Sequence, residues 1–415
     1  MTVRVRLDDL RWRNRAAVIA AIRRARQPSR TEIVSATGLS HSTISAISSD
    51  LLAEGVLSEP KASEPLALKR GRPQVALCLN PLAATIVTVD LSLNALSAAV
   101  FDYAGGVLAE ERLRLATQEI SAQALVDEMI AMVRRLLGER SVDDPQPLRI
   151  VVAVQGVCDA AARSMLWSPI TPHTDIGIAD ALEAAFSIPT AVENDCNMIA
   201  YALRSHDPES YHDDFIAILL SHGIGMGMVL KGETFTGTHS SGGEFGHMIH
   251  QPRGALCRCG RHGCVEAYAG NYAIWRNARM HCDGQMPNKE ITDADVLALA
   301  TIARMSEGPE RDAFRKAGEA LGFTLGSLFA LIDPAPLAFV GVGASVFDLM
   351  EPSLRTALAS TVGGQHANAI TLTTETDEKP LIREGTAKRA LDFIDRNVIA
   401  TSNLAANTSR SSTSP

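Results

Sequence analysis

Three cysteines lie close together in the second half of the chain, at Cys257, Cys259 and Cys264, and His247 precedes them directly after Gly246. Three thiolates and one neutral imidazole form a complete tetrahedral ligand set for Zn²⁺ and leave no open position for a reactive water. The spacing therefore predicts a structural Zn²⁺ site at His247, Cys257, Cys259 and Cys264, which stabilises a folded loop and activates no nucleophile.

Other interpretations of this segment stay open at the level of sequence. His250 and His262 are alternatives to His247 as the fourth ligand. Reduced, buried cysteines without a metal are a further alternative, although cysteines interleaved with glycines rarely serve packing alone. The chain has seven cysteines, and the clustering of three of them is unlike an evenly spread disulfide framework.

Two further stretches carry carboxylate and amide side chains: Glu193-Asn194-Asp195-Cys196-Asn197 and Gly242-Gly243-Glu244-Phe245-Gly246-His247. Taken alone, the first is equally typical of a polar loop that caps a helix. Together with the stretch from Cys257 to Glu266, these motifs closely resemble those of the ROK family, named for repressors, open reading frames and kinases. The resemblance extends over most of the chain.

The resemblance implies an α/β fold with an actin-like, hexokinase-like (ribonuclease H-like) pair of lobes and a sugar in the cleft between them. It implies that Asn194 and Asp195 hydrogen-bond sugar hydroxyls and that Glu244 and Glu266 hold others. His247 would face the sugar while it coordinates the metal. These groups suit a polyhydroxylated ligand, because each hydroxyl can donate to a carboxylate and accept from an amide. In family kinases the residue at the position of Asp195 is the general base.

A kinase also needs glycine-rich loops whose backbone amides contact nucleotide phosphates, and these loops are altered here. The first should resemble Asp-x-Gly-Gly-Thr but has lost both glycines in Asp90-Leu91-Ser92-Leu93-Asn94. The second keeps its glycines, but His222 stands where a phosphate-contacting threonine is expected. In a third, adenosine-side motif, Val342 interrupts a glycine triplet. We therefore expect sugar binding with Asp195 as a ligand and no phosphoryl transfer.

Two other functions compete with this interpretation. One is an ATP-dependent ROK sugar kinase with an attached DNA-binding domain. The other is a metal sensor that uses the three clustered cysteines, which is disfavoured because a coordinatively saturated zinc should not exchange readily.

The first part of the chain has apolar residues at helical spacing in three short segments. Between the second and third, Gly38 suits a tight turn and Ser40 suits a helix cap, which is typical of a helix-turn-helix. The third segment would present small polar side chains to bases or phosphates in the major groove. The predicted DNA contacts here are Ser40, His41, Ser42, Thr43, Ser45 and Ser48. A three-helix unit that mediates protein contacts is the alternative.

Two short apolar runs, 56–58 and 75–79, predict the strands of a wing with a polar loop between them. Arg70 and Arg72 flank a glycine in this loop and would place cations in the narrow, negative minor groove of A·T-rich DNA. Ordinary solvated charge is the alternative. The segments that lead and trail this unit resemble those of the repressor branch of the family.

Beyond residue 84, apolar strands alternate with helical stretches, which indicates an α/β architecture. We expect a winged helix-turn-helix at 1–80 and a first α/β lobe at 81–200 that also includes a returning helix at 383–399. A second lobe with the zinc site should cover 201–400, and 401–415 should be a disordered tail.

Charge is distributed unevenly along the chain. Residues 1–75 hold 13 Lys and Arg against 7 Asp and Glu, and because the whole chain carries −8, the remainder carries −14. The basic part is the candidate for contact with DNA. No apolar stretch approaches the roughly 18–20 residues of a membrane helix, and charge throughout the N-terminus argues against a secretory signal, so we expect no membrane partner and a cytoplasmic location.

Together these patterns predict a sequence-specific transcriptional regulator, a repressor of sugar metabolism genes. Its expected partners are a double-stranded DNA operator and a sugar or sugar-phosphate effector, although a protein effector is an alternative. A single helix-turn-helix covers one half-site, so a homodimer or homotetramer is expected.

Overall fold

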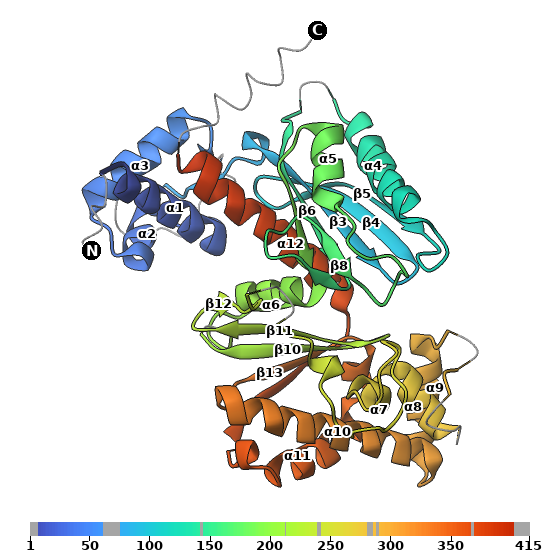
Figure 1. Cartoon of the computed structure of the whole chain (residues 1–415). Helices are drawn as coiled ribbons and strands as arrows, with labels where there is room; N and C mark the ends of the chain where they lie inside the picture. Colours follow the sequence, from blue (N-terminus) through green and yellow to red (C-terminus); the bar gives the residue numbers. More distant parts are fainter. Residues whose placement is uncertain are drawn as a thin grey trace.

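The computed structural model describes residues 7–60, 75–141, 144–211, 213–238, 242–279, 285–287, 290–366 and 369–401. Figure 1 shows a small helical head, a first α/β lobe and a second α/β lobe. The head, residues 7–60 and 75–80, has three helices and a two-stranded antiparallel sheet: α1 (Leu7–Ala25), α2 (Arg30–Thr37), α3 (His41–Ala53), β1 (Leu57–Ser58) and β2 (Cys78–Leu79).

Local side-chain chemistry sets the ends of the head helices. Ser29 begins α2 with a capping box, in which its hydroxyl accepts from the amide of Glu32 and the Glu32 carboxylate accepts from the amide of Ser29. Gly38 ends the helix with a φ of 69°, a left-handed conformation that glycine adopts at little cost. Ser40 then caps α3 by accepting from the amide of Thr43, as its position in the sequence predicted.

The first lobe contains a five-stranded sheet in the order β5-β4-β3-β6-β9. Successive side chains of a strand point to opposite faces, so Val87 and Val89 of β3 pack beneath α4 and α5, whereas Ile86 faces α12. The elements are η1 (Pro81–Ala83), β3 (Thr85–Ser92), β4 (Ala95–Asp102), β5 (Val107–Arg114), α4 (Ala122–Gly138), β6 (Pro147–Val154), β7 (Val157–Cys158), β8 (Met165–Trp167), α5 (Ile178–Phe186) and β9 (Thr190–Asn194).

The second lobe contains another five-stranded sheet, in the order β12-β11-β10-β13-β14. Ala217 and Leu219 of β10 pack beneath α6, and Ile216 and Ile218 face α10 on the other side. The elements are α6 (Asp195–His206), β10 (Phe215–Leu220), β11 (Ile224–Leu230), β12 (Glu233–Thr234), η2 (Phe245–His247), α7 (Glu266–Ala269), α8 (Asn271–Ala278), α9 (Asp293–Met305), α10 (Pro309–Ile332), β13 (Leu337–Val340), η3 (Val342–Leu349), α11 (Glu351–Ala359), η4 (Val362–Gly364) and β14 (Leu372–Glu375).

The chain returns to the first lobe through α12 (Glu378–Ile394) and the π-helical turn η6 (Asp395–Ile399), which together extend further than the predicted helix at 383–399. α12 packs against β3 and β6 and also against α6. The predicted lobe boundary at residue 200 falls inside α6, which packs against β10 and β11, because the change of lobe follows the helix cap at Asn194. Residues 402–415 of the predicted tail lie outside the described residues.

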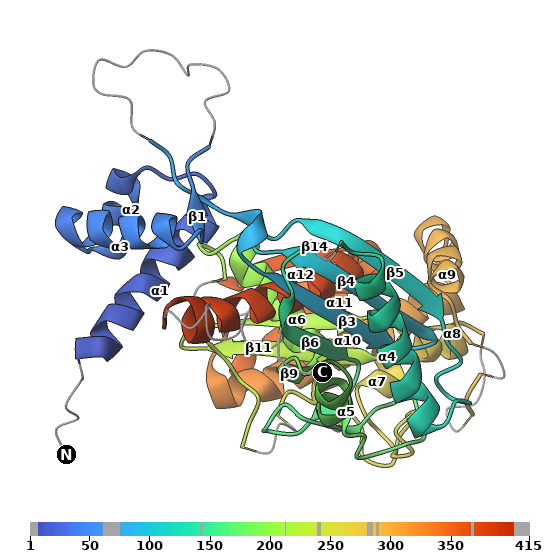
Figure 2. The same cartoon turned by 90° about the horizontal axis from the view of Figure 1, so that it is seen from above.

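The head shares one hydrophobic core with the first lobe and α12. Ile19 and Ile22 of α1 belong to the same buried cluster as Leu391 and Ile394 of α12. In Figure 2 the head lies beside the end of α12, so it is packed against the body of the molecule. A search of the described helices for one long and apolar enough to cross a bilayer finds none.

Candidate functional site

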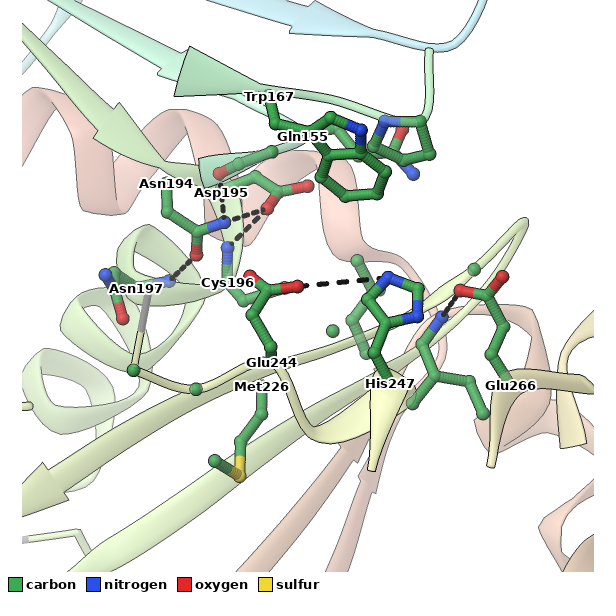
Figure 3. A pocket seen from close by; sticks show the side chains of 18 residues that line it. Gln155, Trp167, Asn194, Asp195, Cys196, Asn197, Met226, Glu244, His247 and Glu266 are labelled. Atoms are coloured by element: carbon green, nitrogen blue, oxygen red, sulfur yellow. Dashed lines mark hydrogen bonds and ion pairs between the residues drawn. The ribbon is translucent and has the colours of Figure 1, made fainter. Parts of the chain in front are cut away.

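The residues predicted to bind a sugar meet at one cavity between the lobes. The cavity is lined by Asn194, Asp195, Glu244, His247 and Glu266, which come from separate stretches of the chain. Figure 3 shows the first two on one side and the other three opposite them. The cavity volume is about 70 Å³, smaller than the roughly 150 Å³ that accommodates a benzene molecule.

Asn194 and Asp195 lie where β9 ends and α6 begins. Asn194 caps the helix by accepting from the amide of Asn197 at 3.0 Å, and its Nδ2 donates to Asp195 Oδ1 at 3.0 Å. The same Oδ1 accepts from the amide of Cys196 at 2.8 Å. Burial, helped by the nearby charge of Asp90, raises the pKa of Asp195 to about 7. The sequence of this turn thus places a buried carboxylate at the cavity wall in a fixed orientation.

The opposite wall carries the other three predicted residues. His247 Nε2 lies 3.8 Å from Glu244 Oε2, and its Nδ1 lies 3.8 Å from Cys257 Sγ. Glu266 is buried and accepts from the amide of Ile224 at 3.1 Å. The Nδ1 atom of the imidazole thus points toward the cysteine cluster, and the Nε2 atom points toward the cavity and Glu244.

The four predicted metal ligands also come together. Their ligand atoms lie within 4.8 Å of one another in His247, Cys257, Cys259 and Cys264. Cys259 Sγ and Cys264 Sγ are 3.7 Å apart. The loop turns tightly at Gly263, whose φ of 87° and whose contact with a backbone carbonyl exclude a side chain. The cluster could hold a metal ion.

The two alternative histidines point elsewhere. His262 Nδ1 lies 3.0 Å from the carbonyl oxygen of Gly254. The ring of His250 packs against Tyr268 and Phe323, with ring centroids 4.9 and 6.1 Å apart. Neither histidine belongs to the group of candidate ligands found among the described residues. Of the three histidines considered from the sequence, the geometry therefore favours His247.

The Glu290 carboxylate lies close to two of the three segments that differ from the kinase pattern. Asn94 Nδ2 donates to Glu290 Oε2 at 3.2 Å, and His222 Nε2 lies 3.8 Å from Glu290 Oε1. In the third altered motif, a Cβ at Gly341 would lie 3.4 Å from Glu378 Oε2. Burial raises the pKa of Glu378. Acidic side chains thus lie beside all three altered segments, and Glu290 lies beside the two that would contact phosphates in a kinase, where a carboxylate would repel them.

On the head, most of the predicted DNA-contacting residues of α3 reach the surface. His41, Ser42 and Ser45 are exposed, and Thr43 is half-buried. Ser40 is exposed as well, but its hydroxyl is engaged in the helix cap and lies 2.8 Å from Thr43 Oγ1. The first turn of α3 therefore presents small polar groups to solvent.

The prediction for Ser48 is wrong. Its side chain is 0% exposed and faces the core with Ile44 and Ile47, and its hydroxyl has no hydrogen-bond partner among the described residues. Arg70 and Arg72, the predicted wing contacts, lie outside the described residues. The flanking strands β1 and β2 do pair, with Leu57 opposite Leu79.

The sequence analysis missed residues that the first lobe contributes to the cavity. Gln155 and Gly156 line it directly after β6, and Trp167 lines it at the end of β8. The Trp167 ring meets the His247 ring edge-on, with centroids 5.7 Å apart. A signal existed for Gln155, because ligands in open α/β sheets bind beyond the carboxyl ends of strands and it follows a recognisable buried strand. No motif marks Trp167.

Comparison with known proteins gives a consistent result. The ROK family profile matches residues 86–382. The xylose repressor of Bacillus subtilis is 24% identical over 344 residues, which cover 83% of this chain and 86% of that protein. The DNA-binding transcriptional dual regulator NagC of Escherichia coli is 23% identical over 353 residues, covering 85% and 86%.

Two solved structures resemble the fold at low sequence identity. A ROK family transcriptional regulator, described as a homolog of the E. coli MLC protein, has a TM-score of 0.75 at 21% identity and covers 97% of this chain and 99% of its own. A ROK family glucokinase from Streptomyces griseus, in complex with glucose and AMPPNP, has a TM-score of 0.60 at 23% identity and covers 74% and 99%. The family profile spans well over half of the residues, and the chain belongs to the ROK family.

Proposed function

We propose that this protein is a DNA-binding transcriptional repressor of sugar metabolism genes, controlled by a sugar or sugar phosphate in the cleft between its lobes. The observation that carries the proposal is the convergence of the five predicted sugar-binding residues on one cavity, in a chain that also has a helical head. The names of its relatives, a xylose repressor and a transcriptional dual regulator, support it.

The cavity chemistry suits a polyol. Asp195, Glu244 and Glu266 offer carboxylate oxygens that accept from sugar hydroxyls, and Asn194 holds Asp195 in place. Trp167 adds an apolar wall against which a sugar ring can lie. Because the cavity is small, we infer that sugar binding changes the separation of the lobes.

The metal that fits the cysteine cluster is Zn²⁺, held by three thiolates and one imidazole in a structural site. Bound zinc would stabilise the loop and draw His247 Nδ1 into its ligand set. The other nitrogen, Nε2, would then carry the proton and donate toward the cavity. The cysteine loop thus orients a sugar-binding side chain.

The head acts in this proposal as a winged helix-turn-helix. α3 enters the major groove with its first turn, and the wing, with Arg70 and Arg72, contacts the minor groove. A homodimer or homotetramer would place two heads on a pseudo-palindromic operator.

One observation favours sugar kinase activity as a second candidate: Asp195, at the general-base position, has a pKa raised to about 7. The Glu290 carboxylate beside the two altered phosphate motifs argues against it. We therefore propose that phosphoryl transfer is lost. ATP-dependent phosphorylation of a sugar by the purified protein would contradict this part of the proposal.

The test is a thermal-shift screen of the full chain against D-xylose, N-acetyl-D-glucosamine, D-glucose and their phosphorylated forms. A ligand that binds only the folded state raises the Tm, by an amount that grows with its concentration relative to Kd. We expect a rise that disappears in Asp195→Ala. A panel without any rise, or a rise that persists in that variant, would contradict sugar binding at this cavity.

A further inference from the structure

A buried ion-pair cluster holds the head on the end of α12. Arg23 of α1 donates to both carboxylate oxygens of Asp395, from Nε at 2.8 Å and from Nη2 at 2.9 Å. Tyr103, just beyond β4, donates its hydroxyl to the same carboxylate at 2.6 Å, and its carbonyl oxygen accepts from Arg23 at 2.8 Å. Asp395 and Tyr103 are 4% and 0% exposed. Because breaking a buried bidentate pair is costly, this cluster fixes the head on η6.

A second contact joins the same two elements. Arg15 of α1 is 1% exposed and donates to the carbonyl oxygen of Ile399 at 3.1 Å. The same guanidinium donates to Glu54, the C-cap residue directly after α3. The orientation of α3 relative to η6 is therefore set through α1.

The other end of the same long segment is packed against the sugar-site helix. Gly385 of α12 lies so close to α6 that a Cβ there would be 1.9 Å from the carbonyl oxygen of Met198. The backbones of α6 and α12 are in direct contact at this crossing, and no flexible side chain lies between them. α6 is the helix that Asn194 caps and Asp195 begins. A shift of α6 therefore has to move α12, because close-packed backbones transmit displacement.

Polar contacts reinforce the crossing. The hydroxyl of Tyr201 in α6 donates to Asp392 of α12 at 2.7 Å. Arg389 of α12 donates to Glu193 at 2.8 Å, directly before Asn194. One face of α12 is thus attached to the segment that carries the sugar-binding residues, and Figure 1 shows α12 running from this region to the head.

We propose that α12 and η6 form the connector that transmits sugar occupancy from the start of α6 to the DNA-binding head, with Asp395 as the joining residue. This inference rests on the proposed function. A ligand shifts an equilibrium only between states that bind it differently, so the proposal includes a second state in which the lobes are further apart. Lobe opening moves α6, α12 follows at Gly385, and the Arg23–Asp395 pair carries the head along.

The first test is hydrogen–deuterium exchange of the full chain with and without saturating D-xylose, N-acetyl-D-glucosamine or D-glucose. In the wild type, a sugar that binds should change exchange in α6 and in α1. In Asp395→Asn the α6 response should remain and the α1 response should disappear. Asp348→Asn is the control, because it also removes a carboxylate that accepts two hydrogen bonds from one arginine, Arg304 of α9, at an exposed place in the second lobe. An α1 response retained in Asp395→Asn overturns the proposal.

The second test compares hydrogen–deuterium exchange in sugar-free variants. It remains informative when a substitution destabilises the head. Tyr103→Phe removes one hydrogen bond to a buried carboxylate, so α1 exchange should accelerate by about 10-fold or more. Tyr201→Phe removes a hydrogen bond from the α6–α12 contact, and it should also accelerate α1 exchange. The double variant should differ from the product of the two single effects by at least about threefold, which is the signature of coupling.

Tyr211→Phe is the control for this cycle, because the Tyr211 hydroxyl contacts Thr373 in the second lobe and not α12. It should leave α1 exchange unchanged. Independent effects of Tyr103→Phe and Tyr201→Phe, or no effect of Tyr201→Phe on α1, overturn the connector. Coupling in the cycle without a response to any sugar supports the connector and contradicts the sugar assignment instead.

Discussion

Replacing Asp195 by asparagine should stabilise the sugar-free protein and weaken sugar binding at the same time. Asp195 is 5% exposed, and burial raises its pKa from 3.8 to about 7. The ionised carboxylate therefore carries a cost in the folded state at neutral pH. Asparagine avoids this cost while its Oδ1 keeps accepting from the amide of Cys196 and from Asn194.

The sign and size of the effect follow from the shifted pKa. The folded-state pKa lies above the unfolded one, so the stability contribution of Asp195 is fully present below pH about 4 and is lost as the pH rises through about 7. At about 1.4 kcal/mol per pKa unit, the cost at pH 8 is at most roughly 4 kcal/mol. In a chain of this length, a gain of 1 kcal/mol would raise the Tm by roughly 1–2 °C.

The assay is thermal unfolding of wild type and Asp195→Asn at pH 5 and pH 8. We expect the variant to gain more stability at pH 8, and its sugar Kd to rise by about 10- to 100-fold because a charge-assisted hydrogen bond is lost. Asp207→Asn is the control, since hydrogen bonds from Ser210 lower the pKa of this exposed carboxylate and no gain at pH 8 is expected. A variant no more stable than the wild type at pH 8, or a gain independent of pH, would refute the reasoning.

Three further predictions concern the metal and the DNA-binding head. Cys257→Ser should reduce the zinc content measured by elemental analysis from one ion per chain to near zero and lower the Tm, because two thiolates and an imidazole do not close the site; undiminished zinc would place the metal elsewhere. Ser48→Ala should leave stability and DNA affinity nearly unchanged or slightly improved, whereas Ser45→Ala on the exposed face should weaken operator binding in a gel-shift assay; the reverse order would contradict the placement of α3. Changing both Arg70 and Arg72 to alanine should reduce the slope of log K against log salt by about 2, and an unchanged slope would remove the wing from the interface.

The convergence of the cavity residues and of the cysteine cluster could be predicted because these residues occur in short motifs. The cysteine loop and the Asn194–Asp195 turn each place their groups within a few residues, so local geometry leaves little freedom. The choice of His247 over His250 needed the structure, because it depends on the path of the chain between Gly246 and the cysteines.

The burial of Ser48, which we predicted to contact DNA, could have been predicted from the sequence. Ile44, Ile47 and Leu51 are buried, and Ser48 completes the i, i+3, i+4, i+7 spacing of one helix face, so its burial follows from the same periodicity that identified the helix. The polar side chain instead suggested an exposed position, since serine is common at DNA interfaces and less common in a core.

The attachment of the head to η6 could not be predicted from the sequence. Arg23 and Asp395 are 372 residues apart, and neither lies in a motif. The position of Trp167 could not be predicted either, because its place in the cavity depends on the β7–β8 hairpin, which reaches toward the other lobe. Long-range contacts of this kind depend on tertiary packing, which composition and periodicity do not encode.

The measurement that tests the central claim most directly is the affinity of the full chain for an operator selected from random duplexes, titrated with and without the sugar that raises its Tm. The account predicts a change in Kd of at least about 10-fold on saturation with sugar, a coupling of about 1.4 kcal/mol, and no change in Asp195→Ala. Equal operator affinity with and without bound sugar would contradict it.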